Sequence, residues 1–142
     1  MRPRSIILFE QLFLVSLVLS LVPLVLGYGA ATAAWSNDPN VRSVGLGPGF
    51  LIGAMVVDYA VYLLLWYLVA RKASNVAKWI LVVGVVLSLI AVPSLLRGPW
   101  TLLTIIGLLV YALEIAAVVL LFKADAKAWL KGEGTADPAA LP

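Results

Sequence analysis

Residues 100–122 read WTLLTIIGLLVYALEIAAVVLLF and contain a single charged residue, Glu114. A helix rises about 1.5 Å per residue and the hydrocarbon core of a bilayer is about 30 Å thick, so about 20 mostly apolar residues can span it. The apolar residues run continuously instead of alternating with polar ones, which argues against a membrane strand. The stretch is therefore predicted to be a transmembrane helix.

Three further stretches pass the same test. Each is bounded by charge, proline, glycine or an aromatic residue of the kind found at membrane interfaces. The four predicted spans are residues 6–27, 50–70, 79–96 and 100–122. The sequence thus predicts an all-α integral membrane four-helix bundle in one domain, residues 1–131, which includes a short surface helix after the fourth span. The tail, residues 132–142, is predicted to be disordered because it is rich in Ala, Pro and Gly.

The composition agrees with a lipid-solvated fold. Of 142 residues, 63% are hydrophobic and 12% charged, and the mean hydropathy is +1.08, whereas a soluble domain is nearer half apolar and a quarter charged. The chain has no Cys and no His, which removes most zinc sites, haem ligation by His, thiol chemistry and imidazole catalysis. We therefore expect no cofactor and no metal. Membrane enzymes generally need clustered polar groups or metal ligands, and the few scattered carboxylates of the spans form no such cluster in the sequence, so no enzymatic activity is expected.

The first span has a rival interpretation. Arg2 and Arg4, the apolar run and the small residues 30–34 resemble a signal peptide with its cleavage site. The apolar run is, however, longer than the usual signal core of 7 to 15 residues and contains Glu10. A membrane anchor is the favoured interpretation.

Basic residues predict the orientation, because short loops rich in Lys and Arg stay in the cytoplasm. Eight of them fall on one side of the predicted membrane and two, Arg42 and Arg97, on the other. The eight are Arg2, Arg4, Arg71, Lys72, Lys78, Lys123, Lys127 and Lys131. Both termini are therefore expected in the cytoplasm, and residues 28–49, which are rich in turn-forming Gly, Pro, Asn and Asp, are expected to form an outer connection.

The basic residues gather at helix ends, where a membrane already accounts for them. The net charge of +3 therefore does not point to nucleic acid. Lys123, Lys127 and Lys131 recur every four residues after the fourth span, and we expect them to contact lipid headgroups from one face of a surface helix.

Three carboxylates lie inside the predicted spans: Glu10, Asp58 and Glu114. An ionisable group in hydrocarbon costs about 2.5 kcal/mol or more, so such residues normally face the protein interior and are functional candidates. No Lys or Arg lies inside a predicted span to pair with them. Their positions along the helices suggest a ladder of protonatable oxygens with steps of about 6 Å.

Two tyrosines share helix faces with the deeper carboxylates. Tyr62 follows Asp58 by four residues, and Tyr111 precedes Glu114 by three, so each pair lies on one stripe. The stripe in the fourth span also includes Thr104 and Gly107. In the first span, by contrast, one face carries only Ser16, Ser20, Pro23 and Gly27, which favours close helix packing.

Two uses of the carboxylates remain open. Glu10 lies near the cytoplasmic edge, where it could act as an anchor that reaches headgroups, Lys78 or Lys123. Asp58 and Glu114 could hydrogen-bond across helices or bind a partner subunit, or they could form a route for protons or cations.

The opening residues 2–12 (RPRSIILFEQL) and the closing residues 121–129 (LFKADAKAW) resemble those of small four-span proteins of unknown function from bacterial inner membranes. The resemblance implies a location in the inner membrane and no activity. A second resemblance, to small multidrug-resistance transporters, is carried by Glu10 alone, since that family uses a membrane-embedded Glu in its first helix. The strong charge asymmetry of this chain departs from the weak asymmetry of transporters that insert in both orientations.

The leading functional prediction is a non-enzymatic structural or accessory subunit of the inner membrane. The alternative is a proton- or cation-coupled small transporter or channel component that uses the intramembrane carboxylates. Expected partners are the lipid bilayer and either a second copy of the chain or another membrane subunit.

Overall fold

The computed structural model describes residues 2–132, and within that range it contains helices and turns but no strand. Four helical segments are long and apolar enough to cross a membrane. They are α1 (Arg4–Leu26), α4 (Pro48–Lys72), the segment Asn75–Arg97 and α7 (Leu102–Leu120). This is the pattern of a multi-pass membrane protein, and the predicted all-α class is confirmed. The tail predicted to be disordered lies outside the described residues, apart from Gly132.

Three of the spans extend a few residues beyond the predicted limits at one or both ends, whereas α7 is shorter than predicted. Helix α4 starts with Pro48, which the first turn tolerates. It ends at Lys72. The next residue, Ala73, has a left-handed φ of 50°, which lets the Ser74 N–H reach the Leu68 carbonyl at 3.0 Å. The Ser74 hydroxyl then accepts the Ala77 N–H at 3.2 Å and caps the next helix.

The third span is continuous but not uniform. It consists of α5 (Asn75–Ser88), the 3₁₀ turn η1 (Leu89–Ala91) and α6 (Val92–Arg97). Pro93 has no N–H and its ring crowds the carbonyl four residues earlier, so the helix tightens locally into the 3₁₀ form.

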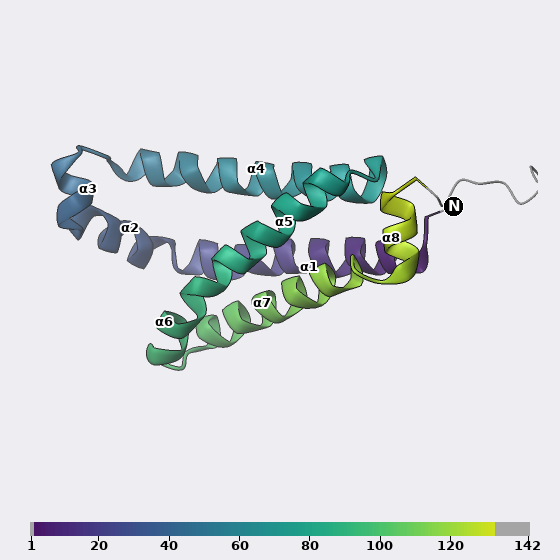
Figure 1. The fold of residues 1–142 in the computed structure, drawn as a ribbon. Coiled ribbons are helices and arrows are strands. Elements are labelled where there is room, and N and C mark those ends of the chain that lie inside the picture. Colours follow the sequence, from purple (N-terminus) through teal and green to yellow (C-terminus); the bar gives the residue numbers. More distant parts are fainter. Residues whose placement is uncertain (1, 133–142) are drawn as a thin grey trace, which may run out of the picture.

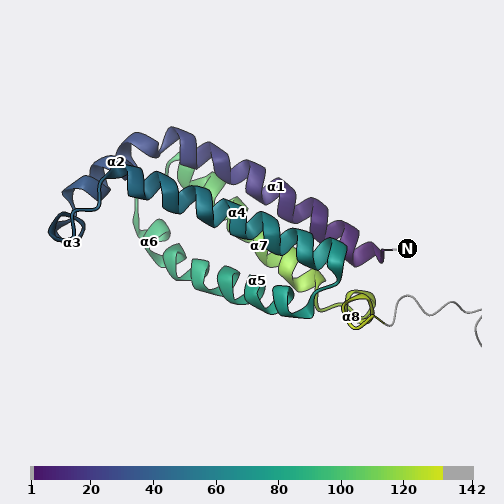
Figure 2. The same ribbon diagram turned by 90° about the horizontal axis from the view of Figure 1, so that it is seen from above.

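The long helices run back and forth along one axis (Figure 1). Helix α1 packs along much of α7, and α4 contacts both α1 and α5. Helix α5 contacts α7 and is inclined to it, so that the two diverge from the end at α6 in Figure 1, while Figure 2 gives the view from above. Helices α2, α3 and α6 lie at one end, and the N-terminus and α8 (Ala124–Leu130) lie at the other.

The packed core is concentrated at the end that holds α8. Its largest fully buried side chains are Ile6, Phe9, Phe13, Val69, Leu81 and Leu121. The Phe9 and Phe13 rings stack at a centroid distance of 5.5 Å. At the opposite end, α2, α3 and α6 bury no residue. The helices are therefore tightly joined at one end only.

The outer connection is more ordered than predicted. Residues 28–49 form two helices, α2 (Tyr28–Asn37) and α3 (Pro39–Ser43), instead of a run of turns. Alanine-rich residues favour α2, and Asp38 starts α3 by accepting the Asn40 N–H at 2.8 Å. The Trp35 indole N–H donates to the Leu46 carbonyl at 3.1 Å, which folds the connection onto itself.

The surface helix after the fourth span is present, but it does not continue α7. The chain turns at Lys123, whose backbone is extended, before α8 begins. Asp125 fixes the new direction: it accepts the Ser5 N–H at 3.1 Å and the Ser5 hydroxyl at 2.8 Å. These hydrogen bonds hold the pKa of the Asp125 carboxyl below its usual range. Helix α8 therefore docks on the start of α1.

Candidate functional site

A cavity of about 340 Å³ lies where the packed core ends, and all four spans contribute to its wall. Leu17 marks the boundary, since it belongs to the core and also lines the cavity. The wall is mostly apolar but carries a cluster of polar side chains. These are Ser20, Asp58, Tyr59, Tyr62, Ser88, Tyr111 and Glu114.

Glu114 is the most buried acid of the cluster. It is 9% exposed, and it shares the buried face of α7 with Val110 and Ala117, which lie one turn away on either side. No hydrogen bond or ion pair joins its carboxyl to any residue in the range 2–132. Each carboxyl oxygen is a strong acceptor, so the buried group is left without a protein partner.

Asp58 lines the same cavity from α4. Unlike Glu114, it remains exposed at the surface of the single chain. Its carboxyl also has no hydrogen-bond partner within the described part of the chain. The two deep carboxylates picked out by the sequence therefore face one cavity from different helices.

The two predicted tyrosines belong to the same wall. The centroid of the Tyr62 ring lies 6.1 Å from that of the Phe13 ring. The Tyr62 hydroxyl packs against Gly84 of α5, where a Cβ atom, if present, would lie 3.4 Å from it. Tyr62 thus fills the space between α1, α4 and α5. Tyr111 lines the cavity one turn from Glu114. Of the predicted α7 stripe, Thr104 does not line the cavity: its hydroxyl donates to the Pro99 carbonyl at 2.9 Å at the start of the helix.

Sequence reasoning missed Ser20 and Tyr59 as site residues. Their hydroxyls hydrogen-bond to each other, and the Ser20 hydroxyl also lies 2.8 Å from the Leu17 carbonyl, its acceptor within α1. The bond joins α1 to α4 at the cavity wall. The sequence predicts only a packing role for Ser20, as part of a face of small residues. For Tyr59, the one available signal is that it directly follows Asp58 in the sequence.

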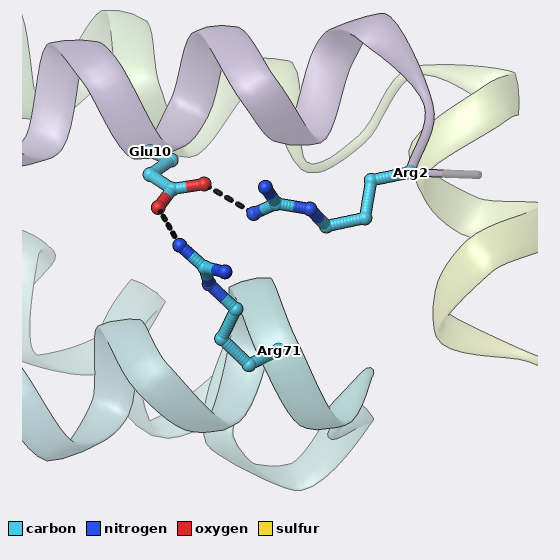
Figure 3. Close-up of polar contacts among 3 residues, drawn as sticks. All are labelled: Arg2, Glu10 and Arg71. Atoms are coloured by element: carbon cyan, nitrogen blue, oxygen red, sulfur yellow. Dashed lines mark hydrogen bonds and ion pairs between the residues drawn. The ribbon is translucent and has the colours of Figure 1, made fainter.

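Glu10 does not belong to the cavity. Its carboxylate accepts hydrogen bonds from Arg2 and, at 2.7 Å, from Nη2 of Arg71 in the last turn of α4 (Figure 3). Of the partners suggested by the sequence, which were headgroups, Lys78 and Lys123, neither lysine pairs with Glu10, because the N-terminal arm and the end of α4 supply Arg2 and Arg71 instead. Of the three carboxylates predicted to form a ladder, Glu10 therefore lies apart from Asp58 and Glu114. Its ion pair with Arg71 joins α1 to α4 at the packed end.

The three lysines of the tail, Lys123, Lys127 and Lys131, are exposed at the end that holds α8. Lys123 lies in the turn before α8 and Lys131 directly follows the helix. Their contacts with lipid headgroups stay a prediction.

The cavity residues can exchange or hold a proton, or supply oxygen ligands to a small cation. Two carboxyls, three phenols and two hydroxyls provide oxygen atoms only. Within residues 2–132, no group of three or more His, Cys, Asp or Glu side chains is placed to hold a metal ion. The chain matches no protein-family model, no curated protein and no solved structure.

Proposed function

We propose that the chain is a non-enzymatic protein of the bacterial inner membrane that binds a proton or a small cation between Asp58 and Glu114, as a component of a small transporter or channel. One observation carries the proposal. Glu114 is buried without a protein partner in a cavity that also receives the carboxyl of Asp58.

The physical reason is the cost of charge in hydrocarbon. An ionised carboxylate at this depth is expensive, and two in one cavity repel each other. A proton shared between them, or a monovalent cation bound by them, reduces the charge. Tyr62 and Tyr111 add hydroxyls that can donate to a carboxylate or accept from a protonated one.

The distribution of charge supports a four-helix bundle with both termini in the cytoplasm. The eight basic residues on one predicted side all belong to the packed end, together with α8 (Figure 1). Under the positive-inside rule that end faces the cytoplasm. The core around Phe9 and Phe13 then closes the cytoplasmic side, and the cavity lies toward the outer half. A reporter fused within residues 71–78 should report cytoplasm, and a periplasmic signal there would contradict the orientation.

The activity is tested in proteoliposomes that carry a pH gradient or a gradient of a small cation. The unmodified chain should dissipate one of these gradients, and Glu114→Gln should abolish the flux while leaving a folded protein. Glu10→Gln is the matched control, because it makes the same chemical change outside the cavity and should retain flux. Equal flux from the unmodified chain and Glu114→Gln would contradict the proposal.

A second function, that of a subunit in a homo-oligomer, is favoured by the exposure of Asp58. A carboxyl at the surface of a span is costly unless another protein covers it. Because the sequence has no Cys, a single introduced Cys reports contact between copies. Val61→Cys, which lies one turn from Asp58 on the same side of α4 and is 44% exposed, should form disulfide-linked dimers in membranes. Val83→Cys, which is similarly exposed on α5, should not. Dimers at neither position, or equally at both, would count against a specific interface.

A further inference from the structure

A buried lysine lies at the packed end, outside the cavity. Lys78 is in the first turn of α5 and is only 5% exposed. Its ammonium group lies 4.2 Å from the centroid of the Phe122 ring and 5.3 Å from that of Trp79. The two rings meet edge to face at 5.8 Å. Lys78 is therefore held by aromatic rings, which attract a cation through their electron-rich faces.

The rings do not satisfy the ammonium group. It carries three N–H donors, and no acceptor for them exists among residues 2–132. Both ion pairs of the described chain are made by Glu10. The acid of α8, Asp125, has both oxygens engaged by Ser5. The side chain is buried, but its nitrogen is not enclosed on all sides: the fully buried polar atoms without a partner in the described range are the indole nitrogens of Trp66 and Trp129. An acceptor from outside the chain can therefore reach the ammonium group, which the aromatic rings hold in place.

A second cation acts on the same position. Lys127 of α8 is near enough for its charge to repel that of Lys78, and its own ammonium has no acceptor within the described range. Two cations at this end of the molecule without a counter-ion from the described chain create a local positive potential. An anion from outside the chain would offset the repulsion and accept hydrogen bonds from the ammonium groups.

The position of the site identifies the anion. Lys78 is the fourth residue of a membrane-spanning segment, so its ammonium lies at the edge of the hydrocarbon, where lipid phosphates are found. Trp79 is 52% exposed and Phe122 is 37% exposed, which leaves apolar ring surface next to the cation for an acyl chain. Basic pockets between spans are a general site for anionic headgroups.

We propose that Lys78 and Lys127 bind the phosphate of one anionic phospholipid, whose acyl chain lies against Trp79 and Phe122. This site is separate from the carboxyl cavity and does not depend on the proposed transport activity. It differs from the general contact expected of the tail lysines, because Lys78 belongs to a span and is buried.

Native mass spectrometry of the purified full chain tests the site. Phosphatidylglycerol or phosphatidylcholine is added to the protein in detergent, and bound lipid is counted at each concentration. The unmodified chain should prefer phosphatidylglycerol. Lys78→Gln should weaken its binding about fivefold, which corresponds to about 1 kcal/mol for one basic contact at 1.4 kcal/mol per tenfold. Lys72→Gln is the matched control, since it removes an exposed charge at the same end and should leave binding unchanged.

Two further variants cover the case in which Lys78→Gln does not fold. Lys78→Arg keeps the charge and should keep the preference. Lys127→Gln changes an exposed side chain, so it should fold normally and still weaken phosphatidylglycerol binding.

Three results would overturn the proposal. The first is an equal loss in Lys78→Gln and Lys72→Gln, which would indicate a diffuse charge effect. The second is no loss in Lys127→Gln. The third is displacement of the lipid by millimolar inorganic phosphate with the same dependence on Lys78, which would make a free phosphate the ligand.

Discussion

Phe13 links the packed core to the cavity, so its removal should affect both. The side chain is fully buried, stacks on Phe9 at 5.5 Å and lies 6.1 Å from Tyr62, which lines the cavity. Phe13→Ala leaves a void beneath Tyr62. In a water-soluble core such a change costs about 3–5 kcal/mol, of which about 1.5–3 kcal/mol is the transfer of the side chain from water.

The transfer contribution is largely missing in a membrane, because separated helices remain in lipid. The packing loss that remains is about 2 kcal/mol. We expect Phe13→Ala to lower the free energy of unfolding by about this amount in a reversible detergent-unfolding assay followed by circular dichroism. Val25→Ala, which is 68% exposed on the same helix, should change it by less than about 0.5 kcal/mol.

Equal effects of Phe13→Ala and Val25→Ala would refute the packed end as the element that holds the helices together. An effect of Phe13→Ala near 5 kcal/mol would also refute the reasoning, since it would require the ring to be transferred to water on unfolding.

Three further predictions concern the ends of helices. Ala73→Gly should raise the melting temperature, because a left-handed φ of 50° costs an L-residue about 1 kcal/mol. A lower melting temperature in the variant would contradict the strain assigned to Ala73. The folded-state pKa of Asp125 is lowered, so its contribution to stability is complete above the pKa of an unfolded aspartate and is lost as pH falls through the folded value. Thermal unfolding should therefore show an acid-induced loss that Ser5→Ala reduces, and an identical loss in both proteins would count against the contact. Arg71→Gln should destabilise the chain by at most about 1 kcal/mol, because Arg71 is half exposed and Glu10 keeps Arg2 as a partner; a loss of several kcal/mol in a melting curve would show that the pair is effectively buried.

The helical class and the spans could be predicted because hydrophobic length is a local property. A run such as residues 102–120 has no alternative in lipid, where every backbone group must bond within its own helix. The structure of residues 28–49 was harder to predict. Gly and Pro in that segment favour turns. The alanines of α2 and the Asp38 cap of α3 favour helices, and in the structure the helices form.

The candidate site was predicted in part, for a different reason. Periodicity placed Tyr111 and Glu114 on one face of α7, and the structure brings that face to Asp58 and Tyr62. Nothing local could pair Glu10 with Arg71, because 61 residues separate them in sequence. The ring contacts of Lys78 were equally unpredictable, since Phe122 lies in the turn after α7 and is 44 residues away in sequence.

The central claim is that Asp58 and Glu114 share a proton or a cation, and infrared difference spectroscopy of the membrane-reconstituted chain tests it most directly. Protonated carboxyls absorb apart from carboxylates, so a change of pH or of cation concentration should give a carboxyl signal in the unmodified chain. We predict that this signal is altered in both Glu114→Gln and Asp58→Asn, because the remaining acid titrates without its partner, and that it is unchanged in Glu10→Gln. A signal that either cavity substitution leaves unchanged, or that is altered only in Glu10→Gln, would contradict the shared site.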